Sequence, residues 1–160
     1  DGNQRFGTNL IYKLNKNITT KFYYDTHAVV DSKAINNIGV FAGYKSDKIR
    51  FGAEYNEMQN GETYKNAAED HNLTGLSFYG SYLLNEKFEV FVRYDKLTSN
   101  QVDGSNTNWN FENDGGLTMV GIEYKAVKGV KFSLNSRNFN YKDSNITDSS
   151  LVYLNAEFKL

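Results

Sequence analysis

The sequence contains no cysteine and no proline. The lack of cysteine excludes a disulfide framework and a thiolate metal site. No apolar run approaches the roughly 18 residues that a membrane helix needs, so a helical membrane span is excluded as well. Lys and Arg are scattered among Asp and Glu, with a formal net charge of -1. No basic stripe therefore points to a nucleic-acid partner.

Aromatic residues are abundant, with 12 Tyr and 11 Phe among 160 residues, although the mean hydropathy is only -0.62. Both facts fit if apolar residues alternate with polar ones along extended segments. A transmembrane β-barrel has this pattern, because its apolar side chains face lipid and its polar ones face a wet lumen. The sequence therefore predicts an all-β fold, an antiparallel transmembrane β-barrel that forms one domain over residues 1–160.

Nine segments alternate with the period of two that a β-strand requires. Each has about the 9–11 residues that a tilted strand needs to cross a bilayer, and Tyr, Phe, Val, Ile and Thr dominate them. The predicted strands are Arg5–Asn15, Ile18–Val30, Ile35–Lys45, Lys48–Met58, Leu73–Leu84, Phe88–Leu97, Leu117–Val127, Val130–Lys142 and Ser149–Leu160.

The eighth segment changes phase along its length. Apolar residues up to Leu134 share one parity, whereas Phe139 and Tyr141 have the other. A β-bulge, which inserts one extra residue into a strand, would restore the alternation. We therefore predict a bulge between about Asn135 and Asn138.

The connections between segments alternate in length. The short ones lie near residues 15–17, 46–47, 85–87 and 128–129, and the long ones at 31–34, 59–72, 98–116 and 143–148. Barrels have short periplasmic turns and longer external loops, so the last strand is expected to run inward to a periplasmic C-terminus. The first strand would then begin outside. Because single-chain bacterial barrels have an even strand number, we expect missing upstream strands, with an eight-stranded barrel and a miscounted strand near Asp1 as the alternative.

Several strands resemble those of a known family. They are Val120–Lys125, Ala126–Lys131, Phe91–Asp95 and Tyr153–Leu160. They are similar to strands of the large porin-like outer-membrane β-barrels of Gram-negative bacteria, over about the last half of the chain. The resemblance implies an outer-membrane protein in contact with lipid, and passive diffusion of small hydrophilic solutes. It also implies a homo-oligomer or a larger outer-membrane complex.

The last strand resembles the signal by which the barrel assembly machinery recognises its clients. That signal usually ends in an aromatic residue, most often Phe. Here the last residue is Leu160, and Phe158 lies two positions before it. This departs from the family pattern but keeps an apolar end. The resemblance assigns Phe158 and Leu160 to the insertion signal.

Charged side chains gather on the parity that is predicted to face inward. They could line a pore and set its charge preference, as rings of charge do in channels. The alternative is a ladder of cross-strand ion pairs that fills or wets the wall. Their near balance of sign argues against a strongly selective pore. The candidate pore-lining residues are Lys21, Asp25, Arg50, Glu54, Glu89, Arg93, Asp95, Glu123, Lys125 and Glu157.

Aromatic residues on the opposite parity lie near segment ends, as expected of the girdles at the two membrane interfaces. The alternative is the core of a β-sandwich, but a core favours Phe, Leu and Ile over the Tyr that prevails here. The candidate girdle residues are Tyr12, Tyr44, Tyr55, Tyr82, Tyr94, Tyr124 and Phe158.

Metal and cofactor sites have little support. His27 and His71 have no second His or Cys at ligand spacing, so no zinc site is predicted. The oxygen-rich loop 98–116 does not match EF-hand spacing and is read as a solvated loop, not as a Ca²⁺ site. Its Trp109 and Phe111 could fold into the lumen, contact a partner or pack over the rim. No cofactor is expected.

Nothing in the sequence places a serine beside a histidine and an acid, so no catalytic residue and no enzyme is predicted. The leading hypothesis is a porin-type diffusion channel. The second is a structural or accessory barrel of a larger outer-membrane complex, whose loops dock partners. The third is a soluble β-rich binding module.

Overall fold

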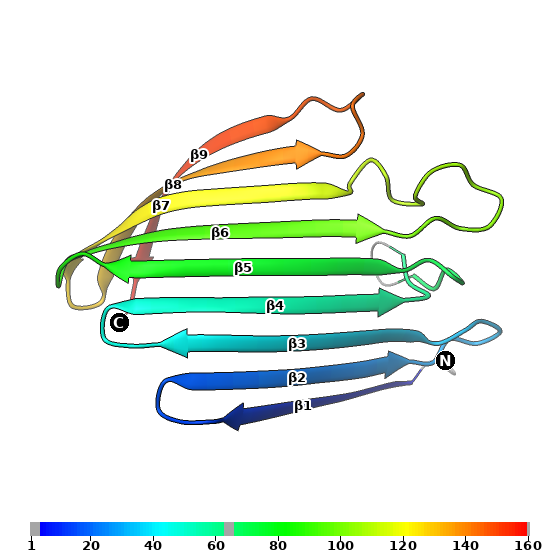
Figure 1. Cartoon of the computed structure of the whole chain (residues 1–160), viewed down its shortest axis with the longest axis horizontal. Coiled ribbons are helices and arrows are strands. Elements are labelled where there is room, and N and C mark those ends of the chain that lie inside the picture. Colours follow the sequence, from blue (N-terminus) through cyan, green and yellow to red (C-terminus); the bar gives the residue numbers. More distant parts are fainter. Residues whose placement is uncertain (1–3, 63–65, 160) are drawn as a thin grey trace.

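The structure is a computed structural model that describes residues 4–62 and 66–159. Its nine strands form one antiparallel sheet in chain order (Figure 1). This confirms the predicted all-β fold and the predicted strand number. The strands are β1 Arg5–Lys13, β2 Ile18–His27, β3 Ile35–Lys45, β4 Ile49–Gln59, β5 Leu73–Leu83, β6 Phe88–Ser99, β7 Gly115–Val127, β8 Val130–Tyr141 and β9 Ser149–Phe158.

The sheet is open at both edges. Within the described residues, β1 pairs only with β2, and β9 pairs only with β8. Because both edges are unpaired there, the sheet is a wall that is not closed into a complete barrel. A search of the described residues for membrane-spanning helices finds none.

Each strand sends alternate side chains to two faces, here called outer and inner. The register aligns Val40 with Tyr55 on the outer face and Phe41 with Glu54 on the inner face. Most of the buried side chains of the strands, Asp25, Ile35, Glu89, Ser99 and Asn135, belong to the inner face. Large exposed apolar side chains predominate on the outer face. A curved sheet crowds the side chains on its concave side, so the inner face is the concave one.

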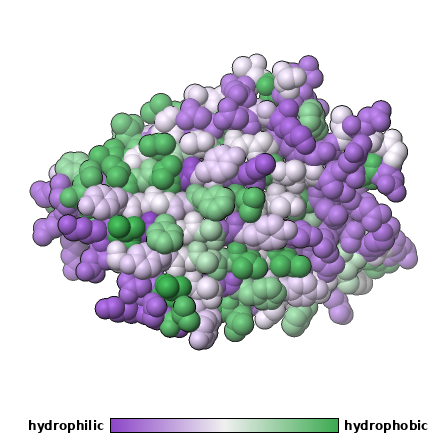
Figure 2. All heavy atoms as spheres, in the orientation of Figure 1, coloured by the Kyte–Doolittle hydropathy of each residue, from purple (hydrophilic) through white to green (hydrophobic). Residues whose placement is uncertain are grey.

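The two ends of the sheet differ (Figure 1). The short turns, residues 14–17, 46–48, 84–87 and 128–129, lie at one end. The longer connections, residues 28–34, 60–62 with 66–72, 100–114 and 142–148, lie at the other. Figure 2 shows hydrophilic residues gathered over the long connections, on the right of the view. We call these the turn end and the loop end.

Side chains fix two of the short turns in the same way. Asn15 Oδ1 accepts hydrogen bonds from the backbone N–H groups of Asn17 (2.8 Å) and Ile18 (2.9 Å). Asn85 Oδ1 does the same two and three residues further along the chain. Such Asx turns replace a backbone turn with a side-chain one. They explain why the chain reverses within a few residues at these two turns.

The predicted bulge in the eighth strand is wrong. Residues Asn135–Asn138 pair without interruption with β7 on one side and β9 on the other. The irregularity lies instead between Lys125 and Val127 of β7, beside the two-residue turn, where Gly129 has a φ of +82°. Phe139 and Tyr141 therefore stay on the inner face. They are tolerated there because the inner face becomes apolar toward the loop end.

Candidate functional site

The register places all ten candidate pore-lining residues on the inner face. It places the seven candidate girdle residues on the outer face. Phe158 packs edge-to-face on Phe132 with 6.5 Å between ring centroids. Leu160, the other residue of the predicted insertion signal, lies outside the described residues.

The outer face carries an apolar band with a polar border toward the loop end. On β4 the outer side chains from Ile49 to Tyr55 are apolar, and Glu57 follows. On β6 they are apolar from Phe88 to Tyr94, and Lys96 follows. From Ile49 to Tyr55 and from Phe88 to Tyr94, six steps along the strand span about 20 Å. The apolar band of outer-membrane barrels is roughly 25 Å tall and its strands are tilted, so each run covers part of that height.

Aromatic residues border this band at the turn end. Tyr44 stacks on Phe51 with 5.2 Å between centroids, and Phe88 stacks on Tyr124 at 4.9 Å. Tyr12, Tyr82 and Phe158 lie near the turn ends of their own strands. Tyr55 and Tyr94 lie six residues from the first residue of their strands, on the loop-end side of the band.

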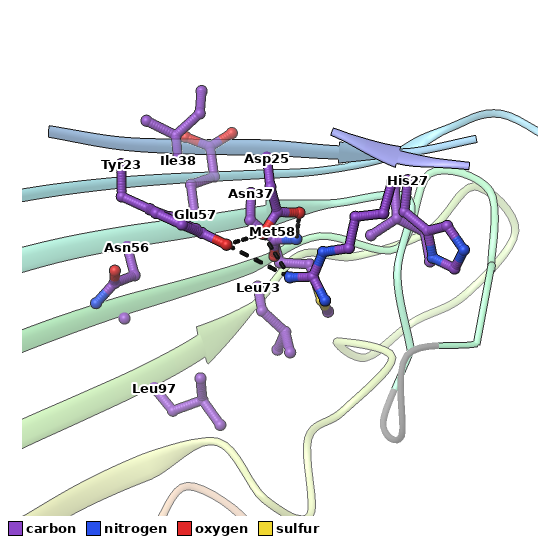
Figure 3. A pocket seen from close by; sticks show the side chains of 13 residues that line it. Tyr23, Asp25, His27, Asn37, Ile38, Asn56, Glu57, Met58, Leu73 and Leu97 are labelled. Carbon is purple, nitrogen blue, oxygen red and sulfur yellow. Dashed lines mark hydrogen bonds and ion pairs between the residues drawn. The ribbon is translucent and has the colours of Figure 1, made fainter. Parts of the chain in front are cut away.

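On the inner face, a buried carboxylate forms the centre of a polar cluster near the loop end (Figure 3). Asp25 is 1% exposed and accepts hydrogen bonds from Arg5 Nη2 (2.6 Å), Asn37 Nδ2 (2.9 Å) and the Tyr23 hydroxyl. A buried charge is stable only when it is paired and hydrogen-bonded. The cluster lines a hollow of about 370 Å³, and Met58 lies on the same hollow.

A second acid cluster lies on the inner face near the turn end. Glu89 accepts a hydrogen bond from Ser81 Oγ (2.6 Å) and lies 3.4 Å from Arg50 Nη1 and 3.8 Å from Lys125 Nζ. Glu123 pairs with a lysine of β8 at 3.0 Å. The predicted cross-strand ion pairs thus exist, and they lie on the same face as the candidate pore-lining residues.

Other candidate residues are paired along their own strand or lack an acid–base partner. Arg93 Nε donates to both carboxylate oxygens of Asp95 (2.9 and 2.8 Å). Glu157 pairs with the lysine that follows β9, at 2.6 Å. In the described part of the chain Lys21 and Glu54 form no ion pair; Lys21 Nζ lies over the ring of Phe41, 5.4 Å from its centroid. The ten candidates therefore form several small networks instead of one site.

Sequence reasoning missed an apolar row on the inner face at the loop end. It lines two adjoining hollows, of about 370 and 320 Å³, which share Gly75 and Leu97. The lumen of this wall is therefore polar toward the turn end and apolar toward the loop end. The row consists of Ile35, Met58, Leu73, Leu97, Leu117 and Phe139.

Trp109 packs against the neighbouring β4–β5 connection at the loop end. Its Nε1–H donates to the carbonyl of Asn72 (3.0 Å), and its ring meets His71 edge-on at 5.1 Å between centroids. Asp114, which is fully buried, holds the same loop by accepting from the Ser99 N–H (2.7 Å) and hydroxyl (2.9 Å). The Asp114 carboxylate is thus occupied by protein donors.

The neighbouring loops are tied together by an ion pair. Lys33 Nζ lies 2.7 Å from Asp70 Oδ1 and 3.7 Å from Glu69 Oε2. The hydrogen bond with Asp70 raises the pKa of Lys33. This contact links the β2–β3 connection to the β4–β5 connection. Three successive loops are therefore joined along the rim.

Within residues 4–62 and 66–159, the structure shows neither a cluster of metal ligands nor a serine beside a histidine base. No three His, Cys, Asp or Glu residues there are grouped to hold a metal ion. The hydroxyl of Ser77 donates to Asp95, and that of Ser81 donates to Glu89. Both serines therefore serve wall carboxylates and do not stand beside a histidine base.

No known family profile matches the sequence, and no curated protein matches it. Two solved structures resemble the fold. The NanC porin has a TM-score of 0.67 and 13% identity over 99% of this chain and 79% of that chain. The outer membrane channel DcaP of Acinetobacter baumannii has a TM-score of 0.69 and 13% identity, over 98% of this chain and 53% of that chain, so our chain spans about half its length. The chain has the fold of the porin-like outer-membrane β-barrels.

Proposed function

We propose that this chain forms part of the wall of a bacterial outer-membrane channel for passive diffusion of small hydrophilic solutes. The observation that carries the proposal is the division between the two faces. The outer face presents an apolar band with aromatic borders, whereas the inner face presents hydrogen-bonded charges of both signs. Lipid on one side and water on the other explain this division. The solved neighbours are a porin and an outer membrane channel, which agrees with the proposal.

The channel needs more strands than the nine described here. An unpaired sheet edge in lipid leaves N–H and C=O groups without partners, and each such group costs several kcal/mol. β1 and β9 both present such an edge. We therefore propose that further strands pair with β1 and β9 and close the barrel. The neighbours, which are longer than this chain, support this.

In this proposal the loop end faces the exterior and the turn end faces the periplasm. Short periplasmic turns and long external loops are the rule for such barrels, so the end of β9 and the C-terminus lie on the periplasmic side. The barrel assembly machinery would recognise the last strand, with Phe158 turned to the lipid face. A homo-oligomer or a larger outer-membrane assembly is the expected state.

The experiment is conductance of the full protein in planar bilayers. We expect stepwise, ohmic openings and only weak preference between K⁺ and Cl⁻, since both charge signs line the inner face. Arg50→Gln should shift the reversal potential toward cation preference. Lys48→Gln removes the same charge from a turn outside the sheet and is the matched control. A correctly folded barrel without conductance would contradict the channel and favour a structural role.

A further inference from the structure

Three inner-face aromatic rings lie over glycines. A Cβ on Gly52 would lie 2.6 Å from Cζ of Tyr79, and a Cβ on Gly43 would lie 2.5 Å from Cζ of Phe41. A Cβ on Gly121 would meet the ring of Phe91. The rings thus occupy the space where these glycines lack a side chain. Close approach of this kind is a reason for glycine within a strand.

Two of these rings adjoin. Gly43 and Gly52 are directly opposite in the β3–β4 register, so the Phe41 ring of β3 and the Tyr79 ring of β5 lie above one glycine pair. The planes of Phe41 and Tyr79 differ by 8°, with 6.2 Å between centroids. We call this pair the aromatic platform. Tyr79 is 39% exposed, whereas Lys21 Nζ lies over the Phe41 ring, 5.4 Å from its centroid.

Polar groups of both signs surround the platform. Lys21 and Glu54 flank Phe41 in the register, one on each neighbouring strand. Glu54 Oε1 accepts a hydrogen bond from Asn56 Nδ2 at 2.7 Å. A hollow of about 250 Å³ adjoins Phe41 and is lined by these side chains. This is below the roughly 300–1,000 Å³ of a drug-sized site, so the hollow suits a single small ring.

We infer that the platform binds the ring of a neutral saccharide as it passes through the channel, an inference that rests on the proposed function. The face of an aromatic ring is electronegative, and it attracts the weakly positive C–H groups on the flat side of a sugar ring. The hydroxyls at the edge of the sugar need both donors and acceptors. Lys21 and Asn56 can donate, and Glu54 can accept. Because Lys21 and Glu54 cancel in charge, the surroundings favour a neutral polyhydroxy solute over an ion.

The test compares a cyclic and an acyclic polyol on the full protein in detergent micelles. Saturation-transfer NMR would measure binding of methyl glucoside and of mannitol, which has hydroxyls but no ring. We expect saturable binding of methyl glucoside and at least about tenfold weaker binding of mannitol, since only the former has a flat face for stacking. Equal binding of the two would overturn the inference and indicate a site that recognises hydroxyls alone.

Variants identify the platform as the site. Tyr79→Ala should weaken methyl glucoside binding about three- to tenfold, the range of one aromatic contact. Tyr79→Phe keeps the ring and should restore binding. Tyr153→Ala is the matched control, because that inner-face ring is already covered by the Arg137 guanidinium at 4.3 Å. If Tyr79→Ala and Tyr153→Ala bind alike, the platform is not the site.

Folding and transport are measured separately. Heat-dependent migration on denaturing gels reports whether the barrel is folded. If Tyr79→Ala does not fold, Phe41→Leu takes its place, because it replaces the other platform ring by an apolar side chain without a flat face. Liposome swelling reports permeation. Binding without permeation would contradict the proposed channel and leave the platform standing. Permeation without binding would overturn the platform and leave the channel standing.

Discussion

Neighbouring residues on β5 have opposite surroundings. Phe78 points to the outer face and is 52% exposed, whereas Ser77 points to the inner face and donates to Asp95. The same contrast recurs on β6, where Glu89 is hydrogen-bonded on the inner face and Val92 is exposed on the outer one. Adjacent residues of a strand therefore differ both in the surroundings that their side chains face and in the interactions that their side chains form.

The two faces tolerate error differently. The outer face depends only on the apolar character of its side chains. Any apolar side chain of suitable size can face the lipid, because lipid chains are fluid and adapt to its shape. The inner face is held by specific pairs. Asp25, for example, depends on donors from β1, from its own strand and from β3. We therefore expect the outer face to fail when a charge is added and the inner face to fail when a partner is removed.

The largest effect is expected from Phe78→Arg. An arginine on the lipid face near the middle of the membrane destabilises a barrel by about 2–4 kcal/mol. Ser77→Arg, one residue earlier, places the same side chain on the inner face, where Asp95 and Glu54 offer partners. Urea unfolding of the protein in lipid vesicles should separate the two variants. Similar losses for both would mean that the outer face is not in contact with lipid.

Removal of the Asp25 carboxylate should have the next largest effect. Asp25→Ala removes the carboxylate that accepts from the Tyr23 hydroxyl and the Asn37 amide, and a hydrogen bond to a charged group contributes about 1.5–3 kcal/mol. Arg5 is 46% exposed and can turn to water, which limits the loss. Asp25→Asn keeps an acceptor oxygen and should lose less. Asp47→Ala in an exposed turn is the control. If Asp25→Ala and Asp47→Ala unfold at the same urea concentration, the cluster does not stabilise the wall.

A smaller effect is expected from Gly52→Ala. Its new Cβ would lie 2.6 Å from the Tyr79 ring, and the ring must lift off the wall, at a rotamer cost on the order of 0.5–1.5 kcal/mol. We expect a lower single-channel conductance with little change in folding. Gly75→Ala is the matched inner-face control, since the nearest atom to its Cβ would be 3.8 Å away. Equal conductance of both variants would show that the ring does not border the open path.

The division into faces could be predicted from the sequence because it is local. Side chains alternate along a strand whatever its partners are, so parity alone separates Glu89 from Val90. Strand number and the order of turns and loops follow from the same alternation and from connection length. The pairs could not be predicted. Arg5 and Asp25 are 20 residues apart and meet only through the β1–β2 register.

The errors share a cause as well. The bulge in β8 was predicted on the assumption that the inner face is polar along its whole length. Phe139 and Tyr141 break that pattern; Phe139 belongs to the apolar row, and Tyr141 lines the same hollow. The aromatic platform was overlooked for the same reason. Its signal was present, since Phe41 and Tyr79 have inner parity and Gly43 and Gly52 lie opposite each other once the strands are paired.

The smallest effect is expected at the rim, where the two faces end and strand periodicity no longer applies. In the β8–β9 loop Asp148 accepts from the Tyr141 N–H (2.9 Å) and from Asn140 Nδ2 (2.8 Å). The bond from the Tyr141 backbone, and to a smaller extent the bond from Asn140, lower the pKa of Asp148. A lowered pKa means that the folded state favours the ionised form of Asp148. The stability that Asp148 contributes is therefore complete above the ordinary aspartate pKa, and it is lost as pH falls through the lowered pKa.

Acidification through the lowered pKa of Asp148 should therefore loosen this loop. We expect the NMR chemical shift of the Asp148 carboxyl to titrate at lower pH than that of an unstructured aspartate, and the Tyr141 amide to respond with it. Asp148→Asn keeps the acceptor oxygen without the charge and should remove the pH response of Tyr141 while the conductance stays the same. A Tyr141 amide that responds equally in this variant would place the acid sensitivity elsewhere in the wall, among the paired carboxylates of the inner face.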